Sequence, residues 1–199
     1  IEAEAVVDRI VYHRRHHPEA TIGVVALSVA QQTCIEAAIE RRSETETELR
    51  DLVTDSRLDG FFVKNLENVQ GDERDIIVIS IGYGPDEVGK LLMNFGPMSR
   101  PGGERRLNVA VTRAKRRVDV VSSVSAGQIK SDNPTTRHLA RYLDYAERGA
   151  EAAQCEGGED EQEHLHAHVP FDPGAEVRPE DAGECREHRR AGCRPGGRE

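Results

Sequence analysis

Basic side chains gather in one stretch of an otherwise acidic chain. The 199 residues carry a formal net charge of −9, yet seven of the 18 residues from Arg100 to Arg117 are Arg or Lys. Arginine suits phosphate because its guanidinium stays charged and can donate to two oxygens at once. The stretch therefore indicates either a site for a phosphate group or an ordinary solvated surface.

Spacing within this stretch predicts that two of the arginines share one platform. A helix over residues 104–116 would place Arg106 and Arg113 on one face. The adjoining apolar stripe consists of Leu107, Ala110, Val111 and Ala114. This stripe would anchor the helix and hold both guanidinium groups in place. Arg116 and Arg117 lead into a strand and fit a solvated surface instead.

A polar turn before an apolar strand is the second candidate for chemistry. In "NVQGDERDIIVIS", Gln70 and Gly71 precede four charged residues and then a run of β-branched side chains. Glycine at position 71 would let the backbone turn sharply or approach a ligand closely. Polar turns precede most strands, so the turn by itself does not identify a site.

Apolar strands alternate with helical patterns along the first 150 residues. Helices are expected over residues 1–17, 29–42 and 104–116 and from Asn133 onward, with a partly helical connection over residues 43–60. Strands are expected over residues 21–28, 61–64, 75–84 and 117–124, and a long loop over residues 85–103. This alternation predicts an α/β domain with a mainly parallel sheet flanked by helices.

The composition changes after about residue 150. Residues 151–199 hold 13 acids and 6 bases, and residues 1–150 hold 23 acids and 21 bases, so most of the acidity belongs to the tail. The tail is polar and rich in glycine, and cannot bury enough apolar surface to offset its ordering entropy. We expect one domain at 1–150, followed by a disordered tail or the truncated start of a further domain at 151–199.

Several classes of protein are disfavoured by composition. No apolar run approaches the ~18 residues that a membrane span needs, and no signal peptide opens the chain. Four cysteines lie far apart or in the tail, unlike a disulfide framework, so a reducing cytoplasm is expected. These features predict a cytoplasmic protein with no membrane partner.

Taken together, the two candidate stretches resemble a known family. "VQGDERDIIVIS", followed by "RRLNVAVTRAKRRVDVV", is similar to motifs V and VI of superfamily 1 helicases, in the branch that includes the nonsense-mediated-decay helicase. Upstream, "TIGVVALSVAQQTCIEAAI" resembles the start of the second motor lobe of these proteins. The resemblance covers roughly residues 1–123 and implies the second RecA-like lobe of a P-loop NTPase.

On the nucleotide side, the resemblance implies roles for four residues. Arg113 matches the catalytic arginine finger of motif VI, which stabilises charge developing on the γ-phosphate. Glu73 matches the motif V glutamate near the nucleotide sugar, and Gly71 belongs to the motif V turn beside it. Arg106 could approach phosphate as well or form a structural ion pair.

Nucleic-acid coupling and helix stability account for the other matched positions. Gln70 belongs to the motif V turn that couples the nucleotide cleft to the nucleic-acid track, and Gln31 lies in the motif IV region. Asn108 and Thr112 match fixed positions of motif VI that hold its helix. Motif IV departs from the usual pattern, since "VVALSVAQQ" lacks a Pro-Tyr pair. This variant is typical of large bacterial helicase-like proteins whose motor is followed by a nuclease-like domain.

Half of an ATP site is absent from these residues. No G-x-x-x-x-G-K-[ST] sequence and no acidic motif that could hold Mg²⁺ against the phosphates occur. ATP and Mg²⁺ are therefore expected only together with the first RecA-like lobe of the same protein. The other expected partner is single-stranded DNA or RNA. The chain by itself is not expected to hydrolyse ATP.

Three alternatives remain open at the level of sequence. A zinc site could use tail residues, but their spacing lacks the close pairs of structural zinc sites; the residues are Cys155, His164, His166, His168, Cys185, His188 and Cys193. A stand-alone nucleic-acid-binding module would need a more basic and more aromatic body. An inactive or truncated helicase-like fragment is the third alternative. No metal ligands are assigned.

Overall fold

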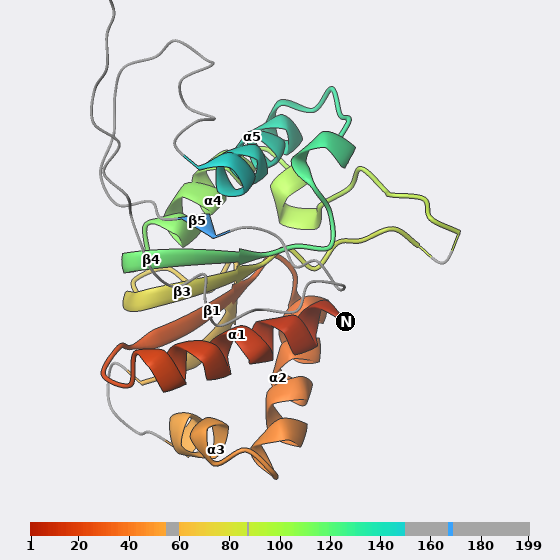
Figure 1. Ribbon diagram of the computed structural model, residues 1–199. Helices are drawn as coiled ribbons and strands as arrows, with labels where there is room; N and C mark the ends of the chain where they lie inside the picture. Colours follow the sequence, from red (N-terminus) through yellow and green to blue (C-terminus); the bar gives the residue numbers. More distant parts are fainter. Residues whose placement is uncertain (55–59, 87, 150–166, 169–199) are drawn as a thin grey trace, which may run out of the picture.

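A parallel β-sheet forms the centre of the molecule (Figure 1). The computed structural model describes residues 1–54, 60–86, 88–149 and 167–168. Within them the strand order is β2-β1-β3-β4-β5, and every neighbouring pair is parallel. The strands are β1 (Ile22–Ala26), β2 (Phe62–Asn65), β3 (Arg74–Ser80), β4 (Ala114–Val121) and the two-residue β5 (Ala167–His168). The α/β class with a mainly parallel sheet is confirmed.

Helices cover both faces of this sheet (Figure 1). One face carries α1 (Glu2–His16), α2 (Val29–Ser43) and α3 (Thr47–Thr54), and the other carries α4 (Gly103–Val111) and α5 (Pro134–Arg148). Short 3₁₀ turns lie at η1 (Gly96–Ser99) and η2 (Ala126–Gln128). Because both faces are covered, β1 is buried along its whole length and β3 is buried at every position except Asp75.

Apolar side chains divide into two cores, one on each face. The core under α1 and α2 includes Val6, Ile10 and Val24, all fully buried. The core under α4 and α5 includes Ile77 and Leu139, also fully buried. These are positions that the alternating helical and strand patterns predict. The sheet is thereby fixed between two helical layers.

Parallel pairing brings the beginnings of the central strands together at one edge and their ends together at the other. The register pairs Val24 with Val78 and Val78 with Asp119, across β1, β3 and β4. The amino ends of these strands form what we call the amino edge, and their carboxyl ends form the carboxyl edge. Seven residues of β3 separate the two edges by roughly 20 Å.

The predicted helix over residues 104–116 is wrong at its end. Helix α4 ends at Val111, and Thr112 is its C-cap. β4 already begins at Ala114, where its backbone pairs with Arg74 of β3. The strand pairing competes with the helix for the same backbone groups and determines the boundary. Arg113 consequently lies in the connection between α4 and β4, and does not share a helix face with Arg106.

Little of the tail falls within the described residues. The predicted disordered tail at 151–199 contributes β5, which pairs with Val118 and Asp119 of β4. The remaining tail residues, including most of the candidate zinc ligands, lie outside the described residues. In the part of the chain that the structure describes, no helix is both long and apolar enough to cross a membrane.

Gly103 tests the packing that holds the start of α4. A Cβ added there would lie 2.5 Å from the carbonyl oxygen of Met98, a backbone atom that cannot rotate away. We expect Gly103→Ala to lower the free energy of unfolding by about 1–3 kcal/mol, as overpacking does. Gly127→Ala is the matched control, since a Cβ there would meet nothing within 4 Å. Urea denaturation measures both; equal stability of the two variants would contradict the expectation.

Candidate functional site

Arg113 lies at the amino edge with its side chain folded against the end of α4. Its Nε donates to the carbonyl oxygen of Val109 at 3.0 Å, and Nη2 donates to Thr112 Oγ1 at 3.3 Å. The side chain is 19% exposed, so the cation is partly desolvated. The negative end of the α4 dipole adds to its stabilisation. The guanidinium is therefore held in place at the surface of the domain.

Glu73 is the acidic neighbour of this arginine. Its Oε1 lies 3.7 Å from Arg113 Nη1, and its side chain is 51% exposed. The two residues are brought together by the sheet, because the N–H of Arg74 donates to the Arg113 carbonyl at 3.0 Å. The structure thus places Glu73, predicted from motif V, beside Arg113, predicted from motif VI. A pair this long and exposed contributes little to stability and can open readily.

Arg74 fixes the beginning of β3 between these groups. It is 7% exposed, and its guanidinium donates to the carbonyl oxygens of Gly60 and Glu73 at 2.8 and 2.7 Å. The same group lies over the ring of Phe62, 4.8 Å from the centroid. Sequence reasoning left Arg74 without a role. Its carbonyl partners and its aromatic contact hold the start of the strand rigid.

The turn before β3 carries the other two predicted motif V residues. Gly71 has φ of 91°, a left-handed conformation that favours glycine, and open space surrounds its Cα. Gln70 is exposed beside it. A close pair between Lys64 Nζ and Asp72 Oδ2, at 2.5 Å, joins this turn to β2. The turn therefore offers an exposed backbone surface next to Glu73.

Helix α4 places the remaining motif VI residues. Arg106 Nη1 donates to the carbonyl oxygens of Pro101 and Pro97, at 3.2 and 3.4 Å. These contacts tie the loop before α4 to the helix, so in this structure Arg106 is engaged with backbone rather than with a carboxylate. Thr112 caps the helix and touches Arg113, whereas the side chain of Asn108 is exposed.

Gln31 lies at the opposite edge of the sheet from Arg113. Its Nε2 donates to Ser80 Oγ at 3.0 Å, at the carboxyl end of β3. Gln70 stands near the beginning of the same strand, so the length of β3 separates the two residues predicted to couple to nucleic acid. Any coupling between them would have to span the length of this strand.

A carboxylate that sequence reasoning missed organises this carboxyl edge. Glu2 Oε1 accepts from Ser80 Oγ at 2.7 Å and from the Gly82 N–H at 2.6 Å. Glu2 Oε2 accepts from the N–H and the hydroxyl of Ser123, at 3.1 and 2.8 Å. One side chain thus joins the segments that follow β3 and β4 and, through Ser80, reaches Gln31. The partners lie up to 121 residues apart, so no local pattern could indicate them.

A buried charged cluster connects α1 to β4. Asp119 is 2% exposed and accepts hydrogen bonds from Arg9, from His13 Nε2 at 2.5 Å and from Arg117 Nε at 2.6 Å. Burial would raise the pKa of Asp119, but these three donors outweigh burial and hold the pKa well below its usual range. The carboxylate is therefore charged at neutral pH.

His13 shares this cluster as a neutral donor. It is fully buried, and burial is the main cause that lowers its pKa below 6.5. Because a carboxylate only accepts, Nε2 must carry the proton, and Nδ1 is left buried without a hydrogen-bond partner among the described residues. Two arginines already neutralise Asp119, so a second proton on His13 would add an unpaired buried charge.

The amino edge can supply positive charge to an anion outside the domain. Arg113 provides this charge, and the exposed carboxylate of Glu73 can accept from a hydroxyl. No cluster of potential metal ligands occurs within the described residues. The arrangement suits electrostatic stabilisation of a phosphate group whose other contacts come from elsewhere.

The comparisons with known proteins agree with this class of fold. Residues 1–125 match the family described as AAA domain, which is more than half of the chain, so the chain belongs to this family. Its parallel sheet with helices on both faces is the fold class that the motif resemblance predicted for a RecA-like lobe.

Two curated relatives carry helicase names. The chain is 39% identical over 134 residues to the "Uncharacterized ATP-dependent helicase MG140 homolog" of Mycoplasma pneumoniae, a match that covers 65% of this chain and 12% of that protein. It is 38% identical over 133 residues to the "Uncharacterized ATP-dependent helicase MG140" of Mycoplasma genitalium, covering 64% and 11%. The chain thus spans about an eighth of the length of these relatives.

A solved structure shows a more distant likeness. It is the C-terminal domain of a possible DNA helicase from Lactobacillus plantarum, at 18% sequence identity and a TM-score of 0.41. The likeness covers 71% of this chain and 75% of that one.

Titration of His13 should make the domain sensitive to mild acid. An unfolded histidine takes up a proton near pH 6.5, whereas folded His13 resists protonation, so stability falls as the pH drops through this region. We expect the melting temperature to fall by several degrees between about pH 7.5 and pH 5.5. In His13→Gln, which can still donate to Asp119 but does not titrate, this fall should be smaller. His138→Gln, an exposed site on α5, is the control; if it flattens the pH profile equally, His13 is not responsible.

Proposed function

We propose that this chain is the second motor lobe of an ATP-dependent superfamily 1 helicase. The single observation that carries the proposal is the pairing of Glu73 with Arg113 at the amino edge, where β3 begins and the connection into β4 ends. A basic finger and an acidic partner on adjacent strand ends fit a nucleotide bound between two lobes. The helicase names of the two relatives support the same reading.

In this proposal Arg113 acts on the γ-phosphate. Its guanidinium lies at the domain surface and is held by Val109 and Thr112, so little ordering is needed before it meets an anion. The long pair to Glu73 would open when a phosphate oxygen offers a closer partner. Glu73 is then free to accept from a sugar hydroxyl, and the turn at Gly71 approaches the nucleotide through its backbone. Arg106 would act indirectly, by fixing the loop before α4.

Nucleic acid would be bound at the carboxyl edge, at the opposite end of the strands from Arg113. Gln31, Ser80 and Glu2 form a connected polar network there, and single-stranded DNA or RNA is the expected ligand. Gln70, near the beginning of β3, would couple nucleotide binding at the amino edge to nucleic-acid binding at the carboxyl edge. Asn108 and Thr112 would maintain α4.

The other proposed partners are ATP, Mg²⁺ and a first RecA-like lobe. Because no phosphate-cradling glycine-rich sequence occurs in the 199 residues, ATP and Mg²⁺ would be bound for hydrolysis only with a first RecA-like lobe of the same protein. Residues 1–150 would form most of the motor lobe, and residues 151–199 would form an acidic segment whose β5 adds to the sheet of the lobe. We place the protein in the cytoplasm.

Arg113→Ala in the protein that contains both lobes tests the finger assignment. We expect nucleotide affinity to change little and kcat for ATP to fall by roughly 10³-fold or more, since the charge acts in the transition state. Arg105→Ala is the matched control, being an exposed arginine on α4, the helix that precedes Arg113. Steady-state ATPase and equilibrium binding of a fluorescent ATP analogue measure the two effects. Turnover that survives the Arg113 change would reject the assignment.

Measuring the ATPase activity of the isolated 199 residues tests whether the first lobe is needed for hydrolysis. We expect no turnover above background, because one lobe supplies only half of the phosphate contacts. Turnover that depends on Arg113 would show that these residues form a complete site. If the two-lobe protein is inactive as well, the chain is an inactive helicase-like interaction module.

A further inference from the structure

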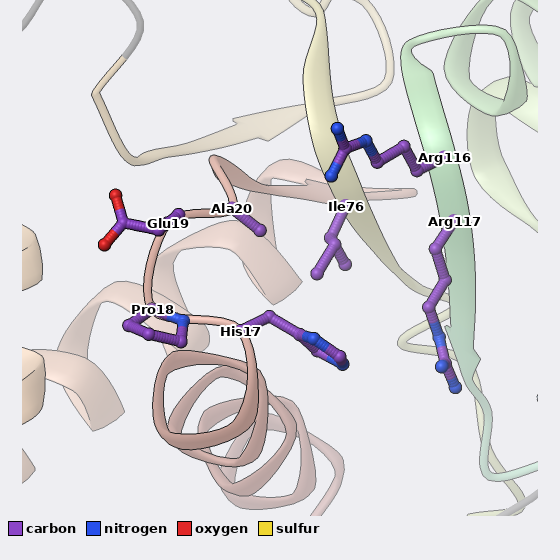
Figure 2. Close-up of a pocket in the computed structure, with 7 residues that line it drawn as sticks. All are labelled: His17, Pro18, Glu19, Ala20, Ile76, Arg116 and Arg117. Carbon is purple, nitrogen blue, oxygen red and sulfur yellow. The ribbon is translucent and has the colours of Figure 1, made fainter.

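A basic cleft lies at the amino edge, on the face of the sheet that α1 covers. It encloses about 420 Å³ between the turn that follows α1 and the beginnings of β3 and β4. Figure 2 shows Arg116 extending from β4 across Ile76, and His17 pointing toward Arg117 from the end of α1. Pro18 and Ala20 complete the apolar part of the lining together with Ile76. The carboxylate of Glu19 points away from these side chains (Figure 2).

The two arginines of the cleft are held differently. Arg117 is 26% exposed and uses Nε to reach the buried Asp119 at 2.6 Å. Within the described residues its terminal nitrogens donate to no other group. Arg116 is 76% exposed, and its nearest carboxylate oxygen is Asp75 Oδ1 at 3.5 Å. Arg117 is thus a positioned cation, and Arg116 is an exposed one whose surface ion pair is weak.

The surroundings of the cleft leave positive charge uncompensated. Asp119 is shared by Arg9 and Arg117, so one carboxylate faces two guanidinium groups. Asp75 is already engaged by the N–H and hydroxyl of Thr21, at 2.9 and 2.8 Å. Among the residues that line the cleft, two arginines, Arg116 and Arg117, stand against one carboxylate, Glu19. This excess is notable in a chain whose net charge is −9.

We propose that this cleft binds a phosphate group of a nucleotide or of a nucleic-acid backbone. Arg117 would supply a fixed donor and Arg116 would close over the anion, exchanging its long contact with Asp75 for a charge-assisted hydrogen bond. The floor of Ile76, Pro18 and Ala20 offers an apolar surface of the kind that a sugar or base can cover.

The cleft is separate from the proposed finger. Arg113 is bonded to α4, which covers one face of the sheet, whereas His17 and Arg117 lie on the face covered by α1. The inference therefore does not depend on ATP hydrolysis, and it can be tested by binding alone. Its failure would leave the assignment of Arg113 unchanged.

Binding of a fluorescein-labelled 20-mer of thymidine and of ATP to the 199-residue chain tests the proposal. We expect Arg116→Gln to weaken at least one of them by roughly fivefold or more, in line with the loss of one charge-assisted contact. Arg137→Gln, an exposed site on α5, removes the same charge far from the cleft and should change affinity less than twofold. Arg116 is exposed, so its substitution is not expected to unfold the domain; circular dichroism verifies this.

The two ligands distinguish the two sources of phosphate. A loss for the oligonucleotide, with its salt dependence reduced by about one phosphate contact, identifies a nucleic-acid backbone. A loss for ATP but not for the oligonucleotide identifies a nucleotide. Equal losses in Arg116→Gln and Arg137→Gln would show that only overall charge matters, and would overturn the proposal. So would the absence of binding by the wild-type chain.

Discussion

The pairing of β3 with β4 is the constraint on which the candidate site depends. The N–H of Arg74 donates to the carbonyl of Arg113, and this one hydrogen bond joins residues 39 positions apart at the amino edge. Because the two strands are parallel, the residues directly before β3 lie next to the residues directly before β4. Glu73 and Arg113 become neighbours for this reason alone, without any direct attraction strong enough to bring them together. The buried carbonyl contacts of Arg74 then keep the strand from slipping.

Helix α1 spans the sheet from its carboxyl edge to its amino edge and contacts both. Its 15 residues extend over roughly 22 Å, about the length of β3. Glu2 at its start binds the carboxyl edge, His13 and Arg9 bind Asp119 in the middle of β4, and His17 just beyond its end lines the basic cleft. A displacement of α1 would therefore disturb Gln31 and the cleft together. The same helix is a physical route by which events at one edge could reach the other.

Local sequence patterns predicted most of the helices and strands, but not the end of α4 or the long-range contacts between elements. The apolar runs at β1 and β3 and the helical spacing at α1 are strong signals, because burial on one or both faces dictates them. The end of α4 was missed because Ala, Arg and Lys favour helices, so "TRAKR" continues the helical pattern that precedes it. Only the distant Arg74 decides that this segment is a strand. The same limit hid Glu2 and Asp119, whose partners, apart from Arg117, are more than 70 residues away in the sequence.

Asp119 shows why a buried charge can be retained at such a place. Replacing an ion pair by apolar side chains is often no less stable, so the cluster is not explained by stability. The carboxylate instead orients two side chains, because Arg9 and Arg117 both donate to it between α1 and β4. A lobe that must present charge to a ligand held largely by another lobe needs its basic side chains anchored to a rigid body. On the α4 face the carbonyl of Val109 anchors Arg113, and on the α1 face Asp119 anchors Arg117. The amino edge is thus provided with a fixed cation on each face of the sheet, and β4 positions both.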